Sequence, residues 1–233
     1  MLEKLKKEVL KANKMLQSSG LVKMTWGNVS GIDDDSKLVV IKPSGVEYDI
    51  LQARDLVVVD LDGNIIEGEL NPSSDTPTHL ELYREFPMIK GITHTHSMYA
   101  TSLCQMGKPL PCLGTTHADH FYGTVPLARP LSEAEVAENY ELNTGKVIVE
   151  TFRKLELNPM EIPAVLQHFH APFTWGKSAI DSVKNSIALE FCAQMAVQGL
   201  QAGILEVMPQ HIQQKHYLRK HGKNATYGQK LGL

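Results

Sequence analysis

The chain is organised around one stretch of seven residues, Gly91-Ile92-Thr93-His94-Thr95-His96-Ser97. Its isoleucine and threonines favour an extended conformation because β-branched side chains pack well in strands. Successive side chains of a strand point to opposite faces, so the stretch predicts a strand that carries His94 and His96 on one face. Two neighbouring imidazoles are a natural chelate for a divalent metal ion. The alternative is a pair of half-buried histidines that are hydrogen-bonded to neighbours, and this stretch alone leaves both interpretations open.

Two further histidine clusters favour the metal site. One is a second H-x-H, His168-Phe169-His170, which is expected to lie on a strand over residues 164–170. The other is His117-Ala118-Asp119-His120, and the three clusters together hold six of the ten histidines. Such a concentration of imidazoles is typical of a metal site.

A third ligand is expected from the second H-x-H. A catalytic zinc site usually has three protein ligands, sometimes with a carboxylate as well, and keeps one position open. We prefer His170 to His168 because it borders Ala171-Pro172, where the strand leaves the sheet and a site can open. His168 is then expected to support a ligand or to lie in the core. A closed structural zinc site is the alternative, although histidine ligands with carboxylates nearby favour catalysis.

The composition is that of an ordinary globular protein. The chain is expected to form one domain over residues 1–233, and its 42% hydrophobic and 21% charged residues are typical of such a domain. A net charge of −3 gives no reason to expect nucleic acid or a membrane surface as a partner. The three cysteines lack C-x-x-C spacing, and the sequence has neither a signal-peptide pattern nor a membrane-spanning run. We therefore expect a cytoplasmic protein with reduced thiols.

Helical and extended patterns alternate along the chain. Besides the strand at His94, strands are predicted over residues 38–42, 56–61, 65–66 and 164–170, and helices over 2–18, 77–85, 133–142, 144–154, 178–200 and 209–220. Helical spacing predicts a core face on the helix over 178–200, formed by Ile180, Val183, Ile187, Phe191 and Met195. Helices at both ends with short strands between them predict an α/β domain in which helices cover one mixed sheet.

Three short segments have the residues of an anion site. They combine small residues, hydroxyls and an amide, and they are Gly27-Asn28, Ser44-Gly45 and Ser73-Ser74. Exposed backbone N–H groups of this kind can hold a phosphate, and the third segment directly precedes a predicted helix N-terminus. Each segment alone is also ordinary turn sequence. Together with Lys42 they predict a phosphorylated substrate.

Several motifs resemble the class II aldolase superfamily. They are Thr25-Trp26-Gly27-Asn28-Val29-Ser30, Lys42-Pro43-Ser44-Gly45-Val46-Glu47-Tyr48, Ser73-Ser74-Asp75-Thr76-Pro77-Thr78-His79 and His94-Thr95-His96-Ser97. Three others are similar to the L-ribulose-5-phosphate 4-epimerases within it: Gly114-Thr115-Thr116-His117-Ala118-Asp119, His216-Tyr217-Leu218-Arg219-Lys220-His221-Gly222 and Tyr227-Gly228-Gln229. The match spans essentially the whole chain in order. It implies a single-domain class II aldolase-like fold with a central, mainly antiparallel sheet covered by helices.

The resemblance also implies roles for individual residues. It implies one divalent ion per subunit, zinc or another metal, held by Asp75, His94, His96 and His170. It implies a sugar-phosphate pocket formed by Gly27, Asn28, Ser44, Gly45, Ser73 and Ser74. Asp119 and Tyr227 match the family's two acid/base groups. Tyr227 is expected to come from the neighbouring subunit of a cyclic homotetramer, whose active sites then lie at subunit interfaces. Asp119 and Tyr227 are thus expected to serve one site from different chains.

The implied reaction interconverts L-ribulose 5-phosphate and D-xylulose 5-phosphate, in arabinose or ascorbate breakdown. C4 of the sugar carries no acidic C–H, so the C3–C4 bond is broken in a retro-aldol step, with the metal stabilising an enediolate. The aldehyde fragment rotates while its phosphate is held, and the bond forms again on the other face. Two proton-transfer groups are therefore required on opposite sides of the C4 oxygen.

Two alternatives belong to the same superfamily. A sibling aldolase would release the aldehyde, but that branch typically has Glu where Asp75 stands, and Asp75 is better suited to be a ligand. A non-catalytic relative such as the adducin head domain would keep the fold as an interaction module. That alternative predicts loss of the metal histidines, which are all present here.

Overall fold

The computed structural model describes residues 2–223, 225 and 226. The strands are β1 (Asn28–Ile32), β2 (Val39–Ile41), β3 (Val57–Val59), β4 (Ile65–Glu67), β5 (Gly91–His94), β6 (Leu127–Ala128), β7 (Ala164–Gln167) and β8 (Pro172–Gly176). The helices are α1 (Glu3–Ser18), α2 (Thr76–Glu85), α3 (Met98–Gln105), α4 (Thr115–Ala118), α5 (Glu133–Lys154), α6 (Ala179–Gln201) and α7 (Gln210–His221), and η1 (Ala53–Asp55) is a short 3-10 helix.

All eight of these strands form one sheet in the order β4-β3-β2-β1-β5-β8-β7-β6. Neighbouring strands are antiparallel except β6 and β7, so the expectation of a mainly antiparallel sheet is confirmed. The connection through Asp62-Gly63-Asn64 joins β3 and β4 as a hairpin, and these are residues typical of a tight turn. β5 lies in the middle of the sheet, between β1 and β8, and it ends at His94.

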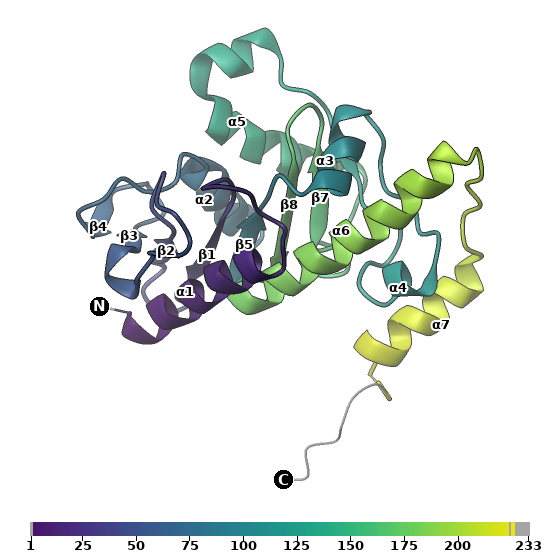
Figure 1. Ribbon diagram of the computed structural model, residues 1–233, viewed down its shortest axis with the longest axis horizontal. Helices are drawn as coiled ribbons and strands as arrows, with labels where there is room; N and C mark the ends of the chain where they lie inside the picture. The colour runs from purple at the N-terminus through teal and green to yellow at the C-terminus, as the bar shows by residue number, and fades with distance from the viewer. Residues whose placement is uncertain (1, 224, 227–233) are drawn as a thin grey trace.

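The sheet forms the middle layer of the molecule (Figure 1). In β2 and β3, Val40 and Val58 pack in a core cluster with α1 and the first turns of α6. The side chains on either side of them in each strand belong to a second cluster, which includes residues of α2 and α5. This alternation follows from the two-residue period of a strand. Helices therefore cover both faces of the sheet, and the α/β class is confirmed.

The predicted core face of α6 is partly wrong. Phe191 and Met195 are 54% and 44% exposed, whereas α6 is buried largely through small residues such as Ala193 and Ala196. At its start α6 approaches β5 so closely that a Cβ on Gly91 would lie 2.4 Å from the backbone of Ala179. Close packing against a sheet selects small residues on the contact face, so larger apolar residues lie elsewhere on the helix. Within the described chain, not even this 23-residue helix is both long and apolar enough to cross a membrane.

Candidate metal and substrate site

His94 is fixed by three kinds of contact at the end of β5. Its backbone pairs with Asn28 of β1 and Phe173 of β8. Its Nδ1–H donates to the carbonyl of Pro172 at 3.0 Å, and its ring stacks on Phe173 with centroids 4.2 Å apart. With the proton on Nδ1, the lone pair is on Nε2, which lies 3.2 Å from the Nε2 of His96. A hydrogen bond from the other ring nitrogen is the usual way in which a metal-binding histidine is oriented.

The predicted strand through His96 is too long by two residues. β5 ends at His94, and His96 lies in the short connection to α3. The expectation that the two imidazoles lie side by side is nevertheless met, because their ring centroids are 5.0 Å apart. His96 stands at the exposed rim, whereas His94 is buried.

The second H-x-H is not part of a strand. β7 ends at Gln167, and Phe169 has a φ of 62°, in the left-handed region that a strand does not use. The turn carries the His170 ring to 4.9 Å from that of His94 and 5.3 Å from that of His96. His168 stacks on Phe169 instead and does not line the same cavity. The choice of His170 over His168 is therefore consistent with the geometry, although for a different local reason.

The three histidines form a donor set that suits a divalent metal. Ligand nitrogens of His94, His96 and His170 all lie within 4.8 Å of one another. Zinc–nitrogen bonds of about 2.0–2.1 Å in a tetrahedron place two nitrogens roughly 3.4 Å apart, close to the His94–His96 separation. Burial of the ring lowers the pKa of His170 to about 3, and partial burial with His94 nearby lowers that of His96 to about 4. Both imidazoles are thus neutral at pH 7, as metal ligands must be.

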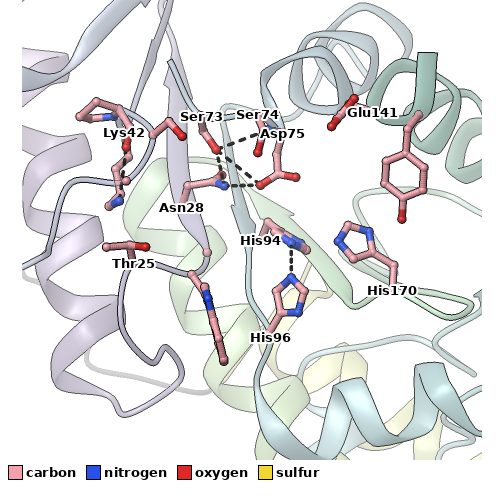
Figure 2. A pocket seen from close by; sticks show the side chains of 16 residues that line it. Thr25, Asn28, Lys42, Ser73, Ser74, Asp75, His94, His96, Glu141 and His170 are labelled. Carbon is pink, nitrogen blue, oxygen red and sulfur yellow. Dashed lines mark hydrogen bonds between the residues drawn. The ribbon is translucent and has the colours of Figure 1, made fainter. Parts of the chain in front are cut away.

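Asp75 lines the same cavity near His94, just before α2 (Figure 2). Its Oδ2 accepts a hydrogen bond of 2.7 Å from Nδ2 of Asn28, which also donates to Oγ of Ser73 at 2.9 Å. Burial opposes ionisation of Asp75, but the electrostatic interaction with the neighbouring histidines, His94 above all, and the Asn28 hydrogen bond outweigh it and lower the pKa of the carboxyl. Asp75 does not belong to the close histidine group, so its predicted role as a ligand stays a prediction.

The cavity has a volume of about 380 Å³ and is lined by all ten residues predicted for metal and substrate. They are Gly27, Asn28, Ser44, Gly45, Ser73, Ser74, Asp75, His94, His96 and His170. Gly27 has a φ of 80°, and a Cβ there would lie 2.7 Å from the carbonyl of His94, so this position requires glycine. The three turn segments converge because β1 and β2 are adjacent strands and the third segment leads into α2.

The cavity also contains one fully buried cation. Lys42 is 1% exposed, its Nζ lies 4.8 Å from the ring centre of Tyr48, and it donates to the carbonyl of Pro43 at 3.3 Å. Burial lowers the pKa of Lys42 to about 8. A buried ammonium with so little compensation is stabilised by an anion. Lys42 therefore strengthens the expectation of a phosphorylated substrate.

Two cavity residues, Tyr140 and Glu141, lie outside every sequence motif named above. They follow a break in α5 at Asn139, whose φ of −164° and ψ of 94° are not helical. Oδ1 of Asn139 accepts the N–H of Leu142, so this side chain caps the second half of the helix. This break lies inside the helix predicted over residues 133–142, so that prediction is wrong at this point. Nothing in the local pattern indicated that the break faces a cavity.

Asp119 does not line the cavity of its own chain. It follows α4 and faces α7, where its carboxylate accepts hydrogen bonds from Nδ1 of His216 at 3.2 Å and Nη2 of Arg219 at 2.8 Å. Nζ of Lys220 lies 3.3 Å from it. Burial works against ionisation, but these cationic partners lower the pKa of Asp119 below its ordinary value. Tyr227, the other predicted acid/base residue, lies outside the described residues.

Comparisons with known proteins agree with these features. The family model of the class II aldolase and adducin N-terminal domain matches residues 7–197. L-ribulose-5-phosphate 4-epimerase UlaF of Salmonella paratyphi A is 51% identical over 231 residues, which cover 98% of this chain and 100% of that protein. A structure of L-fuculose 1-phosphate aldolase is 28% identical with a TM-score of 0.77, covering 91% of this chain and 94% of the other.

A more distant structure shows the fold alone. L-fuculose-1-phosphate aldolase from Thermus thermophilus is 23% identical with a TM-score of 0.67, covering 88% of this chain and 98% of the other. The resemblance drawn from the sequence motifs is confirmed by the family match and by the identity to the epimerase. This chain belongs to the class II aldolase and adducin N-terminal domain family.

Proposed function

We propose that this protein is an L-ribulose-5-phosphate 4-epimerase that interconverts L-ribulose 5-phosphate and D-xylulose 5-phosphate. The observation that carries the proposal is the cavity, which unites three imidazoles with a wall of hydroxyl, amide and ammonium groups. The first set suits a metal and the second a phosphate. The named relative at 51% identity selects this activity among those of the family.

His94, His96 and His170 would hold the metal, with Asp75 as a fourth ligand or as a charge beside it. When bound, a divalent ion supplies positive charge for the oxygens that gain electron density as the C3–C4 bond breaks. Asn28, Ser44, Ser73 and Ser74, with the backbone at Gly27 and Gly45, hold the phosphate of the aldehyde fragment. Lys42 neutralises that phosphate. Retention of the phosphate lets the aldehyde rotate without leaving, so the bond can form again on its other face.

Proton transfer at the C4 oxygen is assigned to Asp119 and Tyr227. An ionised Asp119 can accept the C4 hydroxyl proton, and a phenol with a pKa near 10 can return one. The family resemblance implies that Asp119 and Tyr227 reach one site from different chains. Because Asp119 lies outside its own cavity, we instead place it in the cavity of a neighbouring subunit. Thr226, the residue before Tyr227, donates to the carbonyl of Arg219, which itself bonds Asp119, so we assign Tyr227 to the same neighbouring site. This assignment requires an oligomer, for which we propose a cyclic homotetramer.

We also propose a cytoplasmic location and zinc as the metal. The location is supported by Cys104, Cys112 and Cys192, which are all free thiols. Zinc is supported by the all-nitrogen trio, since imidazole is a common zinc ligand in catalytic sites. Manganese or another divalent ion is the alternative that metal analysis distinguishes.

The test is to incubate the zinc-loaded protein with L-ribulose 5-phosphate and to follow D-xylulose 5-phosphate. We expect epimer to form up to an equilibrium mixture, with activity lost on chelation and restored by metal. Accumulation of glycolaldehyde phosphate without epimer would identify a sibling aldolase instead. Turnover that survives complete removal of the metal would contradict the proposed role of the histidines.

A further inference from the structure

Glu190 of α6 caps the N-terminus of α3, the helix that follows His94 and His96. Its Oε1 accepts the N–H of Tyr99 and its Oε2 accepts the N–H of Ala100, each at 2.9 Å. These are the second and third residues of α3, whose first N–H groups have no partner within the helix. Ser97 stands at the N-cap but its side chain makes no capping hydrogen bond. A carboxylate from another helix therefore does what a local cap does elsewhere.

This contact matters because the first two metal histidines are held in different ways. His94 is fixed by two strand neighbours, by the Pro172 carbonyl and by the Phe173 ring. His96 lies after the end of β5, at the exposed rim, and within the described residues its ring is hydrogen-bonded to His94. The position of His96 is consequently set by the chain on either side of it. Before it stands β5, and after it stands the start of α3.

We propose that Glu190 is a positioning residue for the metal site, because it fixes the start of α3 and thereby holds His96 against His94. The inference rests on the metal site of the proposed function. Hydrogen bonds from N–H groups to a carboxylate are stronger than neutral ones, and a negative charge is favoured at a helix N-terminus. Two bonds to consecutive amides also fix the direction of the helix axis. Buried Leu103 and Cys104 hold the second turn of α3, whereas the two amides that Glu190 accepts belong to its first turn.

The test uses Glu190→Ala and Glu190→Gln in the full-length protein, with Ser178→Ala as a matched control. Oγ of Ser178 accepts the N–H of Asp181 and caps α6 itself, so the control also loses a helix cap, but at the start of α6, about three turns before Glu190. The metal dissociation constant is measured by competition with a chromophoric chelator. The absorption bands of the cobalt-substituted protein report the coordination geometry, and thermal unfolding of the metal-free protein reports stability.

We expect Glu190→Ala to weaken metal binding by roughly 10–100-fold, as the loss of a supporting residue does at other metal sites, and to change the cobalt bands. Glu190→Gln keeps one acceptor oxygen and is expected to be intermediate, and it also serves if the alanine variant does not fold. Ser178→Ala is expected to lower the unfolding temperature without changing either metal readout. Wild-type affinity and wild-type cobalt bands in both Glu190 variants would overturn the proposal. A wild-type protein that binds no metal would overturn this inference and the metal site together, whereas failure of the Glu190 variants alone leaves the epimerase proposal intact.

Discussion

Two regions of the molecule carry the predicted chemistry, and they hold polar groups in opposite ways. In the cavity, burial keeps His170 neutral, and its Nδ1 has no hydrogen-bond partner within the described chain. In the α4–α7 corner, which is formed by residues 115–119 and 210–221, Asp119 keeps its charge because His216, Arg219 and Lys220 surround it. The cavity is thus prepared for a cation and an anion from outside. The corner holds an ionised carboxylate that has no cavity of its own, and this difference is what leads us to combine the two regions across a subunit interface.

The largest effect is expected from removing a ligand in the cavity. His96→Asn should abolish metal binding and turnover, a greater loss than the roughly 10–100-fold caused by changing a supporting residue. The fold should persist because a core of this size does not depend on a catalytic metal. Metal analysis, turnover and thermal unfolding of the metal-free variant check these outcomes. Full metal occupancy in the variant would mean that the ligand set is wrong.

The next largest loss of activity is expected from changing the two proposed proton-transfer residues. Asp119→Asn and Tyr227→Phe should each lower turnover by roughly 10²–10⁴-fold while leaving metal occupancy unchanged, as expected for loss of proton transfer. When His96→Asn and Asp119→Asn chains are unfolded together and reassembled, roughly a quarter of the sites should be complete if mixing in the ring is random. Mixing Asp119→Asn with Tyr227→Phe chains should restore nothing, because both groups are then contributed by one neighbour. A mixture of the first pair that stays inactive after verified reassembly would refute a shared site.

A smaller loss of activity is expected when a residue that is proposed to hold the phosphate is changed. Asn28→Ala removes the amide that bonds Asp75 and Ser73. We expect KM to rise about tenfold, the equivalent of one charge-assisted hydrogen bond, and some aldehyde phosphate to escape. Assay of free glycolaldehyde phosphate during turnover measures this leak. An unchanged KM with no leak would show that Asn28 does not touch that fragment.

The smallest effect is on stability, and its dependence on pH should differ between the cavity and the α4–α7 corner. The pKa of His170 in the folded protein is about 3, below its unfolded value near 6.5, so the unfolded state binds more protons between these values. The metal-free protein should therefore lose stability as the pH falls from 6.5 toward 4, and His79, fully buried with a pKa of about 3, should add to this loss. Asp119 has a lowered pKa, so its contribution is present above about 3.9, its unfolded value, and is lost only below it.

Urea unfolding at pH 7, 5.5 and 4.5 measures this difference. His170→Asn should make the pH dependence of the midpoint shallower, because asparagine does not titrate, while His79 and the other buried histidines keep the remainder. Asp119→Asn should lower the urea midpoint by a similar amount at all three pH values. An Asp119→Asn variant whose loss of stability disappears between pH 7 and 5.5 would contradict the ion-paired state of that carboxylate.

Much of this site could be predicted because its parts are short motifs with local meaning. Gly27-Asn28, Ser44-Gly45 and Ser73-Ser74 are turn segments, and turn residues are the ones whose backbone can face a ligand. The prediction that they share one cavity came from the family resemblance, since no local pattern states which turns meet. Glu141 was missed for the same reason, and Glu190 lies 94 residues beyond His96 along the chain, so only the packing of α6 on α3 brings them together.

The alternation of helices and short strands and the apolar faces of most of them follow from the amino-acid order alone. The same holds for the prediction that His94, His96 and His170 bind a metal. All of these depend on side-chain chemistry and on periods of 3.6 and 2 residues. Where the elements end, and what lies opposite them, depends on long-range packing. β5 ends at His94 and β7 at Gln167 because the chain must turn to bring three imidazoles together, and Phe169 adopts a left-handed conformation to do so. Asp119 faces α7 and not the cavity because α4 packs on α7, a long-range contact that no local pattern encodes.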